Sequence, residues 1–191
     1  MRDTAAHNGD AITPFHAGRL KFFYAAWSTI TSDQWILEEI QGVRIEFVRT
    51  PYQLSPSKGL TVNRSEALVV DSEINKLLEK RVIEPVSSEP GEYISSIFLH
   101  PKKDGTYRVI LNLKPLNQFV EYHHLKMDTI YTAIQLMKQG CYMASIDLQD
   151  AYYTVPVYQG HRKYLRFAWY GQLYQYTCLP NGLAFAPRIF T

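Results

Sequence analysis

The sequence predicts an α+β fold, with helices on one face of a mixed, largely antiparallel β-sheet. Two pairs of apolar, alternating runs predict β-hairpins: residues 94–113 turn at Asp104-Gly105, and residues 164–178 turn about Gly171. Ahead of the first hairpin, residues 65–80 place apolar side chains on one helical stripe and charged side chains on the opposite side. These three features together favour a sheet with at least one helix packed on it.

The N-terminal part of the chain is expected to be mainly helix and linker. Residues 1–18 are rich in Gly, Asn, His and Thr without a period, which predicts disorder. Ser32 or Asp33 is placed to cap one short helix, and Ser65 is placed to cap the amphipathic helix. We therefore expect residues 19–82 to be an N-terminal helical extension with a proline-containing linker.

Two aspartates follow a predicted strand in the middle of the chain. Asp128 is placed to cap a helix that Gly140 ends, and the short apolar run 141–146 then predicts a buried strand that delivers Asp147 at its carboxyl end. If the chain turns helical there, Asp147 and Asp150 share one face and both carboxylates look into one cleft. Such a pair suits magnesium, although an isolated Asp-x-x-Asp is more often a structural cap.

Near its end the chain is expected to turn and then become helical. The turn at Pro180-Asn181-Gly182 leads to a helix that begins near Ala186-Pro187, where Pro suits a first turn. Thr191 follows after barely one helical turn. We therefore expect the sequence to be a fragment of a longer protein.

The composition is that of a folded protein with a real core. The chain has 191 residues, of which 46% are hydrophobic and 14% aromatic. No apolar run reaches the ~18 residues that span a bilayer, and no secretory signal begins the chain, so an intracellular protein without a membrane partner is expected. Cys141 and Cys178 are far apart in apolar surroundings, so we expect core thiols rather than a disulfide or a metal site.

The charge is distributed unevenly along the chain. Residues 1–98 carry ten Lys and Arg against thirteen Asp and Glu, whereas residues 99–191 carry ten against five. From Ala151 onward there is no acid at all, and the basic residues lie among seven tyrosines. This composition predicts a basic, aromatic surface for a polyanion, and the alternative is a solvated basic face beside a tyrosine-rich core.

Three segments in order resemble the motifs of reverse transcriptases, and their amino-acid sequences are most similar to those of retrotransposon polymerases. Residues 96–117 resemble the fingers motif, residues 145–157 the motif with the first catalytic aspartate, and residues 179–190 the motif that grips template and nucleotide. The resemblance implies a fold of the polymerase fingers and palm type. It implies that residues 83–191 are a reverse transcriptase domain, truncated within the palm.

A finer resemblance is to the DIRS-like group, whose elements carry a tyrosine recombinase. It depends on residues 124–129 and on residues 19–23 upstream. The chain departs from the wider family at Asn181, where Gln is usual, and at Asn112, where Asp is usual, although the DIRS-like group tolerates both.

The resemblance implies a role for each matched residue. Asp147 would be the catalytic residue and would bind two magnesium ions, with the Leu148 carbonyl as a further metal ligand. Lys103 and Arg108 on the first hairpin would hold the incoming triphosphate. Tyr152 would be the gate whose ring clashes with a 2′-hydroxyl and so selects deoxynucleotides.

The remaining predicted contacts are to the nucleotide and to the nucleic acid. Asp150 and Ala151 would border the nucleotide, and Asn181 and Gly182 would form the loop beneath it. The residues expected to contact the primer–template are Lys102, Arg162, Lys163, Arg166 and Arg188.

The leading functional hypothesis is part of an RNA-directed DNA polymerase that adds deoxynucleoside triphosphates to a primer on an RNA or DNA template. The remaining catalytic carboxylates of such enzymes would lie beyond Thr191, so we expect the chain alone to be inactive. Its expected partners in the parent protein are the downstream polymerase, RNase H and recombinase or integrase regions. The alternatives are a noncatalytic nucleic-acid-binding remnant and a template-directed RNA polymerase.

Overall fold

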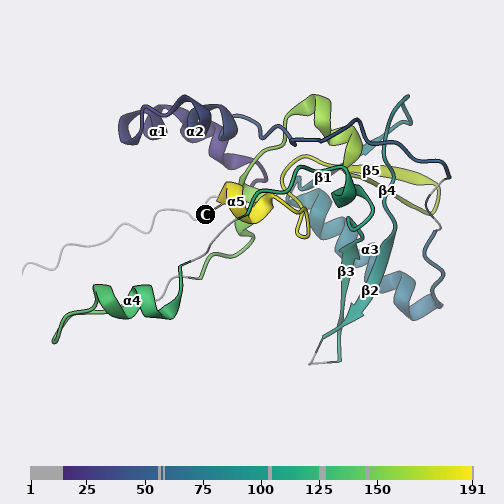
Figure 1. The fold of residues 1–191 in the computed structure, drawn as a ribbon. Coiled ribbons are helices and arrows are strands. Elements are labelled where there is room, and N and C mark those ends of the chain that lie inside the picture. The colour runs from purple at the N-terminus through teal and green to yellow at the C-terminus, as the bar shows by residue number, and fades with distance from the viewer. Residues whose placement is uncertain are drawn as a thin grey trace, which may run out of the picture.

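The computed structural model describes residues 15–55, 57, 59–102, 105–124, 128–144 and 147–190 (Figure 1). Within these ranges the chain forms two antiparallel sheets, one long helix and several short helices around one hydrophobic core. This arrangement confirms the predicted α+β class. No helix in the described ranges combines the length and apolar character needed to cross a membrane.

The larger sheet has three strands and joins distant parts of the chain. Its order is β1 (Ile83–Val86), β5 (Gln172–Tyr176) and β4 (Arg166–Trp169), all antiparallel. The β4–β5 turn places Tyr170 at φ 43° and Gly171 at φ 81°. Two consecutive left-handed residues are what a two-residue hairpin turn needs, so the hairpin predicted about Gly171 is confirmed.

The smaller sheet is the first predicted hairpin. Strand β2 (Ile97–Pro101) pairs with β3 (Tyr107–Leu111), and the backbone N–H of Lys102 donates to the Thr106 carbonyl over 2.7 Å. The hairpin is confirmed. Asp104, the predicted turn residue, lies outside the described residues.

Helix α3 (Arg64–Glu79) packs against both sheets through contacts with β1 and β3. Its cap is Asn63, whose side chain accepts from the Glu66 N–H while the Glu66 carboxylate accepts from the Asn63 N–H. The prediction of Ser65 as cap is therefore wrong, and the Ser65 hydroxyl donates to the Asn63 side chain instead. The reciprocal Asn63–Glu66 bonds satisfy two N–H groups at once. The buried stripe consists of Ala67, Val70, Ile74 and Leu77.

The N-terminal extension contains three short helices: η1 (Arg19–Phe23), α1 (Tyr24–Ile30) and α2 (Gln34–Glu39). Of the two caps considered for α2, the structure has Asp33, whose carboxylate accepts from the Trp35 N–H over 2.9 Å.

Order begins earlier than the sequence predicts. Ala17 is 4% exposed, its N–H donates to the Lys80 carbonyl, and the Gly18 N–H donates to the Tyr153 carbonyl. The prediction of disorder is therefore wrong for residues 15–18, and residues 1–14 lie outside the described residues.

The remaining elements are short helices that follow the first hairpin along the chain. They are η2 (Leu116–Gln118), η3 (Ala151–Thr154), η4 (Gln159–Tyr164) and α5 (Ala186–Phe190). Helix α5 confirms the helix predicted after the Pro-Asn-Gly turn. Cys178 is fully buried in the core, as predicted, but Cys141 is exposed, so the expectation of two core thiols is wrong for Cys141.

Helix α4 (Ile130–Leu136) lies on an arm that projects away from the sheets (Figure 1). Its N-cap is Thr129 rather than Asp128, and its C-cap is Met137, so the helix ends before Gly140. Residues 141–144 are exposed and form no strand, so the predicted buried strand is wrong over this part. A strand needs a neighbour for its backbone hydrogen bonds, and no described strand pairs with this stretch.

Candidate active site

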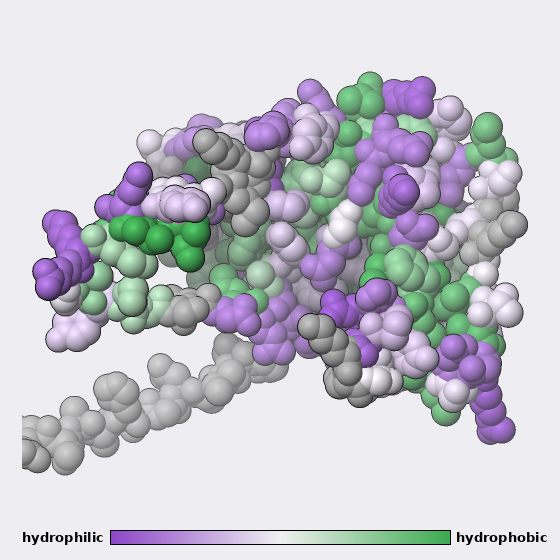
Figure 2. All heavy atoms as spheres, turned by 60° about the horizontal axis from the view of Figure 1, so that its bottom comes forward, coloured by the Kyte–Doolittle hydropathy of each residue, from purple (hydrophilic) through white to green (hydrophobic). Residues whose placement is uncertain are grey.

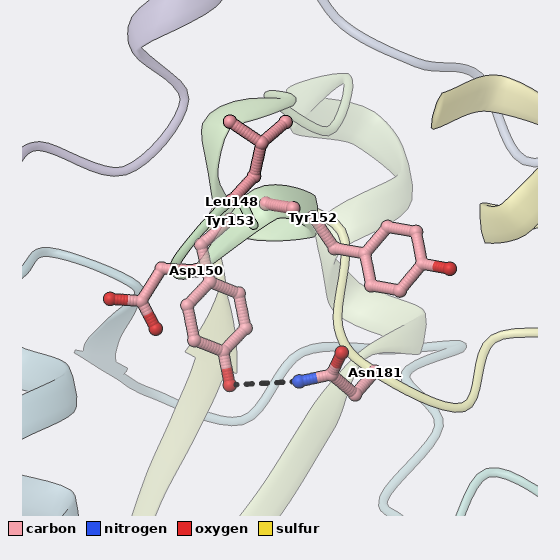
Figure 3. A pocket seen from close by; sticks show the side chains of 6 residues that line it. Leu148, Asp150, Tyr152, Tyr153 and Asn181 are labelled. Atoms are coloured by element: carbon pink, nitrogen blue, oxygen red, sulfur yellow. Dashed lines mark hydrogen bonds between the residues drawn. The ribbon is translucent and has the colours of Figure 1, made fainter. Parts of the chain in front are cut away.

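A pocket of about 290 Å3 opens at the start of η3 (Figure 3). It is lined by Leu148, Asp150, Ala151, Tyr152, Tyr153 and Asn181. Five of these six residues are ones that the sequence assigns to metal or nucleotide binding. The fold thus brings Leu148 and residues 150–152 together with the distant Asn181, while their individual roles stay predictions.

Asp147 and Asp150 do not share a helical face, contrary to the prediction. Helix η3 begins only at Ala151, and Asp150 precedes it in the left-handed conformation at φ 56°. Asp147 is exposed, and among the described residues no hydrogen bond or ion pair holds its carboxylate. The two carboxylates therefore have different environments and cannot be treated as one helical pair.

The carboxylate of Asp150 is already engaged. The Lys80 ammonium donates to its Oδ2 over 2.6 Å, and the two side chains are 36% and 21% exposed. This leaves Asp147 as the one predicted carboxylate without a partner in the described ranges. Because Mg2+ takes six oxygen ligands and two ions are expected, these residues alone do not fit a complete magnesium site.

Tyr153 connects the two sides of the pocket. Figure 3 shows its hydroxyl and the Asn181 side chain pointing toward each other, and the Asn181 amide donates to that hydroxyl over 3.5 Å. Burial, then the nearby Cys178 and Asp150, raise the pKa of Tyr153 well above its usual range. Tyr153 is therefore a neutral phenol that helps to hold Asn181, a role that the sequence did not predict.

Tyr152 projects in a different direction from Tyr153 (Figure 3). Its half-buried ring packs edge to face on Phe190 of α5, with 5.5 Å between ring centroids. Tyr152, the predicted gate residue, thus lines the pocket while its ring is held by the aromatic contact with Phe190.

The loop that carries Asn181 is clamped by Asn117. The Asn117 amide donates to the Gly182 carbonyl over 2.9 Å, and its side-chain oxygen accepts from the Ala184 N–H over 3.0 Å. Gly182 has φ 92°, which explains why Gly occupies this position. Nothing in the sequence links position 117 with position 182, so sequence reasoning missed Asn117.

The predicted cations of the first hairpin lie on an exposed surface. Lys102 follows β2, and Arg108 lies on β3 opposite His100. Neither lines the pocket. Lys103 lies outside the described residues.

Arg166 does not lie on a basic surface, contrary to the prediction. Its side chain is 4% exposed and donates to Glu92 over 2.5 Å, to Glu89 over 2.9 Å and to Gln175 over 2.8 Å. A guanidinium so enclosed has no face left for a polyanion. Its placement is that of a structural residue.

The other predicted basic contacts are also used within the fold, though less completely. Arg162 donates to the Val157 carbonyl and lies 3.4 Å from a Glu84 oxygen. Arg188 lies 3.8 Å from a Glu46 oxygen and over the Trp35 ring. The half-buried Lys163 has its ammonium 5.4 Å from the centre of the Tyr164 ring. Acids of the N-terminal half thus neutralise arginines of the C-terminal half, and the predicted basic track is interrupted.

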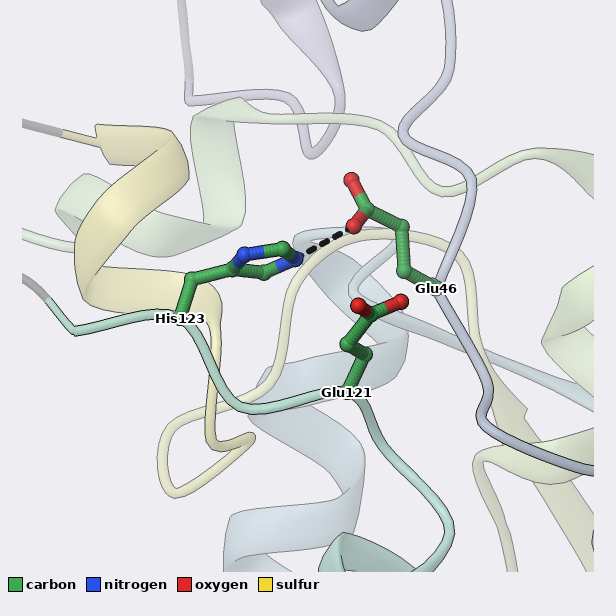
Figure 4. Close-up of side chains that lie close together, drawn as sticks. All are labelled: Glu46, Glu121 and His123. Carbon is green, nitrogen blue, oxygen red and sulfur yellow. Dashed lines mark hydrogen bonds and ion pairs between the residues drawn. The ribbon is translucent and has the colours of Figure 1, made fainter.

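Glu46, Glu121 and His123 form a separate cluster that the sequence did not predict (Figure 4). A bridge between Phe47 and Val120 brings the two segments together, and the ligand atoms of the three side chains lie within 4.8 Å of one another. Figure 4 shows the His123 ring directed at Glu46, with Nε2 2.5 Å from the carboxylate oxygen. Two of the three groups are therefore partners of each other, as in an ordinary ion pair.

Comparisons with known proteins agree with the placement of these motifs. Residues 100–191 match the family described as reverse transcriptase (RNA-dependent DNA polymerase). The Tf2-7 and Tf2-3 transposon polyproteins of Schizosaccharomyces pombe are each 24% identical over 165 residues, which is 84% of this chain. The chain spans only 12% of the length of these relatives.

Solved structures show the same fold. A foamy viral protease-reverse transcriptase in complex with dsDNA covers 77% of this chain with a TM-score of 0.64 and 21% identity, and 30% of that chain is matched. The native prototype foamy virus protease-reverse transcriptase covers 76% with a TM-score of 0.62 and 21% identity, and 19% of that chain is matched. The fold, the order of the motifs and the family match agree with one another: residues 100–191 are similar to a reverse transcriptase domain of the kind found in retrotransposon polyproteins.

Proposed function

We propose that this chain is the part of an RNA-directed DNA polymerase that receives the incoming deoxynucleoside triphosphate and presents the first catalytic aspartate. The observation that carries the proposal is the pocket in which Leu148, Asp150, Ala151, Tyr152 and Asn181 come together inside the matched region. The chain is a small part of its relatives, so the activity would belong to the parent protein. There it would act on a primed template, in keeping with the dsDNA complex of the foamy viral enzyme.

In this proposal each residue near the pocket has one task. Asp147, which is exposed and precedes the pocket-lining Leu148 in the sequence, would be a ligand of magnesium together with the Leu148 carbonyl. The metal ions would neutralise the triphosphate while the primer hydroxyl attacks. Tyr152 would lie under the sugar, and Asn181 and Gly182 would border the nucleotide. Lys102, Lys103 and Arg108 on the hairpin would hold phosphates.

The domain boundaries of the parent are also a proposal. We place the start of the reverse transcriptase domain at residue 83 because β1 pairs with β5, which lies within the matched region. Residues 19–82 would then be an N-terminal extension packed on that domain. A parent of the DIRS-like group, with RNase H and recombinase or integrase regions downstream, remains the finer proposal from the sequence resemblance.

The 191 residues alone are proposed to be catalytically silent. Asp150 is paired with Lys80, so Asp147 is the one predicted metal ligand whose carboxylate has no partner in the described ranges. Two magnesium ions need more carboxylates than this chain brings to the pocket. We propose that these come from the natural downstream sequence.

The test is primer extension with two chains. A chain extended with its natural downstream sequence should add deoxynucleotides to a primed RNA or DNA template with magnesium, and the 191-residue chain should not. Asp147→Asn in the extended chain should lower the rate by about three or more powers of ten, because the charge that holds the metal is lost. Duplex binding should persist. Extension by Asp147→Asn at the wild-type rate would exclude Asp147 from catalysis.

One alternative has an observation in its favour. Arg162, Arg166 and Asp150 are all engaged within the fold, as expected of a noncatalytic remnant that keeps a stable core. Such a remnant would bind duplex through the hairpin but remain inactive even with its downstream sequence. An inactive extended chain that still binds duplex would favour this alternative.

A further inference from the structure

Residues 150–153, here called the pocket loop, contact parts of the chain that lie outside the matched reverse transcriptase region. Residues 15–18 form a short strap that joins the end of α3 to η3. The Ala17 N–H donates to the Lys80 carbonyl over 3.0 Å, and the Gly18 N–H donates to the Tyr153 carbonyl over 2.8 Å. Gly18 has φ 66°, and a Cβ there would lie 3.1 Å from the Pro156 side chain. The strap therefore fits closely against the loop.

Lys80, whose carbonyl accepts from the strap, also contacts the pocket loop through its side chain. Its ammonium lies 2.6 Å from Asp150 Oδ2 and 5.8 Å from the centre of the Phe15 ring. Asp150 has φ 56°, a left-handed conformation that is uncommon for a residue with a side chain, although Asp adopts it more readily than most. The ion pair with Lys80 restrains Asp150 at the residue that precedes η3.

The contacts continue from Asp150 to the other side of the pocket. The Tyr153 N–H donates to the Asp150 carbonyl over 2.9 Å, and the Asn181 amide donates to the Tyr153 hydroxyl over 3.5 Å. Lys80 is therefore connected to Asn181 through two residues that line the pocket. Among the described residues, no contact connects Lys80 with Asp147.

We propose that Lys80, with the strap of residues 15–18, is a positioning residue for the nucleotide pocket. This proposal rests on the proposed function and adds to it that Lys80 and residues 15–18, which precede the proposed domain, control nucleotide binding. The contacts that start at Lys80 end at residues that line the pocket and not at Asp147. Loss of the Lys80–Asp150 ion pair should therefore weaken binding of the triphosphate more than it slows the chemical step. Lys80 acts through Asp150 and does not itself contact the nucleotide.

The first test uses the 191-residue chain and needs no activity. Lys80→Met removes the charge and keeps the length of the side chain, and it should speed hydrogen exchange at the Tyr153 and Gly18 amides about tenfold or more. Lys80→Arg should restore most of the protection. Lys76→Met, at an exposed position of the same helix, is the matched control and should change exchange less than about twofold. Unchanged exchange in Lys80→Met would overturn the proposal.

Asp150→Asn removes the other charge of the Lys80–Asp150 ion pair and replaces Lys80→Met in this test if that variant does not fold. It should speed exchange at the same two amides, and adding Lys80→Met to it should bring little further change, because one interaction has been removed twice. Independent, additive effects of the two substitutions would contradict a shared ion pair.

The second test uses the extended chain in primer extension. Lys80→Met should raise the KM for deoxynucleoside triphosphate about tenfold while kcat stays within about threefold of wild type, and Lys80→Arg should recover the KM. A merely structural loss would lower the active fraction, and so kcat, without moving KM. If the wild-type extended chain is inactive, the proposed function fails, while the exchange result still decides whether Lys80 positions the loop.

Discussion

The guanidinium of Arg166 is buried against the carboxylate of Glu92, and this contact fixes the loop after β1 to strand β4. Burial alone would raise the pKa of Glu92, but hydrogen bonds from Ser88 and Arg166 outweigh it and hold that pKa below its usual value. The Arg166 side chain also reaches Gln175 on β5. The buried guanidinium of Arg166 thus connects both strands of the β4–β5 hairpin to the loop that follows β1.

Arg166→Met should destabilise the fold by about 3–5 kcal/mol, because it leaves the largely buried Glu92 carboxylate without its cation. Arg162→Met, which removes a more exposed and longer contact with Glu84, should cost about 1 kcal/mol or less. Urea unfolding followed by tryptophan fluorescence measures both. Equal small losses would mean that Arg166 is not a structural residue.

Glu39 should make the stability depend on pH near neutrality. Burial, and then the negative charges of Glu46 and Glu38, raise the pKa of Glu39 from 4.5 to about 7. The stability that protonated Glu39 contributes is complete below pH 4.5 and is lost as pH rises through about 7. Glu39→Gln cannot ionise, so it should stabilise the protein at about pH 8 by roughly 1–2 kcal/mol after allowance for solvent screening.

The measurement for Glu39 is urea unfolding at about pH 5 and about pH 8, where the wild type and Glu39→Gln should differ only at the higher pH. Glu79→Gln, at an exposed position of α3, is the control and should leave the pH dependence unchanged. If Glu39→Gln and the wild type lose stability in parallel, Glu39 does not titrate in this range.

The exposed hairpin cations should dominate binding to a primer–template duplex. Lys102→Ala and Arg108→Ala should each weaken binding and reduce the slope of log affinity against log salt by about 1. Arg162→Ala should change neither, because that side chain is engaged with Val157 and Glu84. Fluorescence anisotropy over a salt series measures both quantities. Equal losses for all three variants would exclude the hairpin as the main contact.

The α4 arm should cause self-association. Ile130, Ile134 and Leu136 are 72%, 54% and 79% exposed, and Figure 2 shows hydrophobic residues gathered on the projecting arm. Exposed apolar groups close together favour association. Ile130→Gln with Ile134→Gln should shift the sedimentation profile toward monomer. Leu54→Gln, at a position 92% exposed but away from the arm, should not. The same shift in both variants would contradict a role of the arm.

The parts of the fold that follow from local chemistry could be predicted from the sequence. Gly171 marks the β4–β5 turn because the turn needs left-handed residues, and the stripe from Ala67 to Leu77 predicts the buried face of α3. That Leu148, residues 150–152 and Asn181 lie in one pocket was expected from the resemblance to reverse transcriptases, although the use of each residue is still a prediction.

The parts that depend on distant partners could not be predicted. The charge count could not show that Glu92, 74 positions away, encloses Arg166. Helical spacing placed Asp147 and Asp150 on one face, but Asp150 is left-handed before the helix begins and its carboxylate is paired with Lys80. The apolar run 141–144 has strand composition, but a strand forms only where a neighbour completes its hydrogen bonds.

The pairing of β1 with β5 has a consequence for synthesis on the ribosome. Glu84 of β1 and Gln175 of β5 are 91 positions apart, and their side chains meet only once both strands exist. At about 5–20 residues per second, β1 waits roughly 5–20 s for its partner. During this time its backbone edge is open to other chains, so we expect the nascent protein to depend on a chaperone that holds the N-terminal half until the last hairpin emerges.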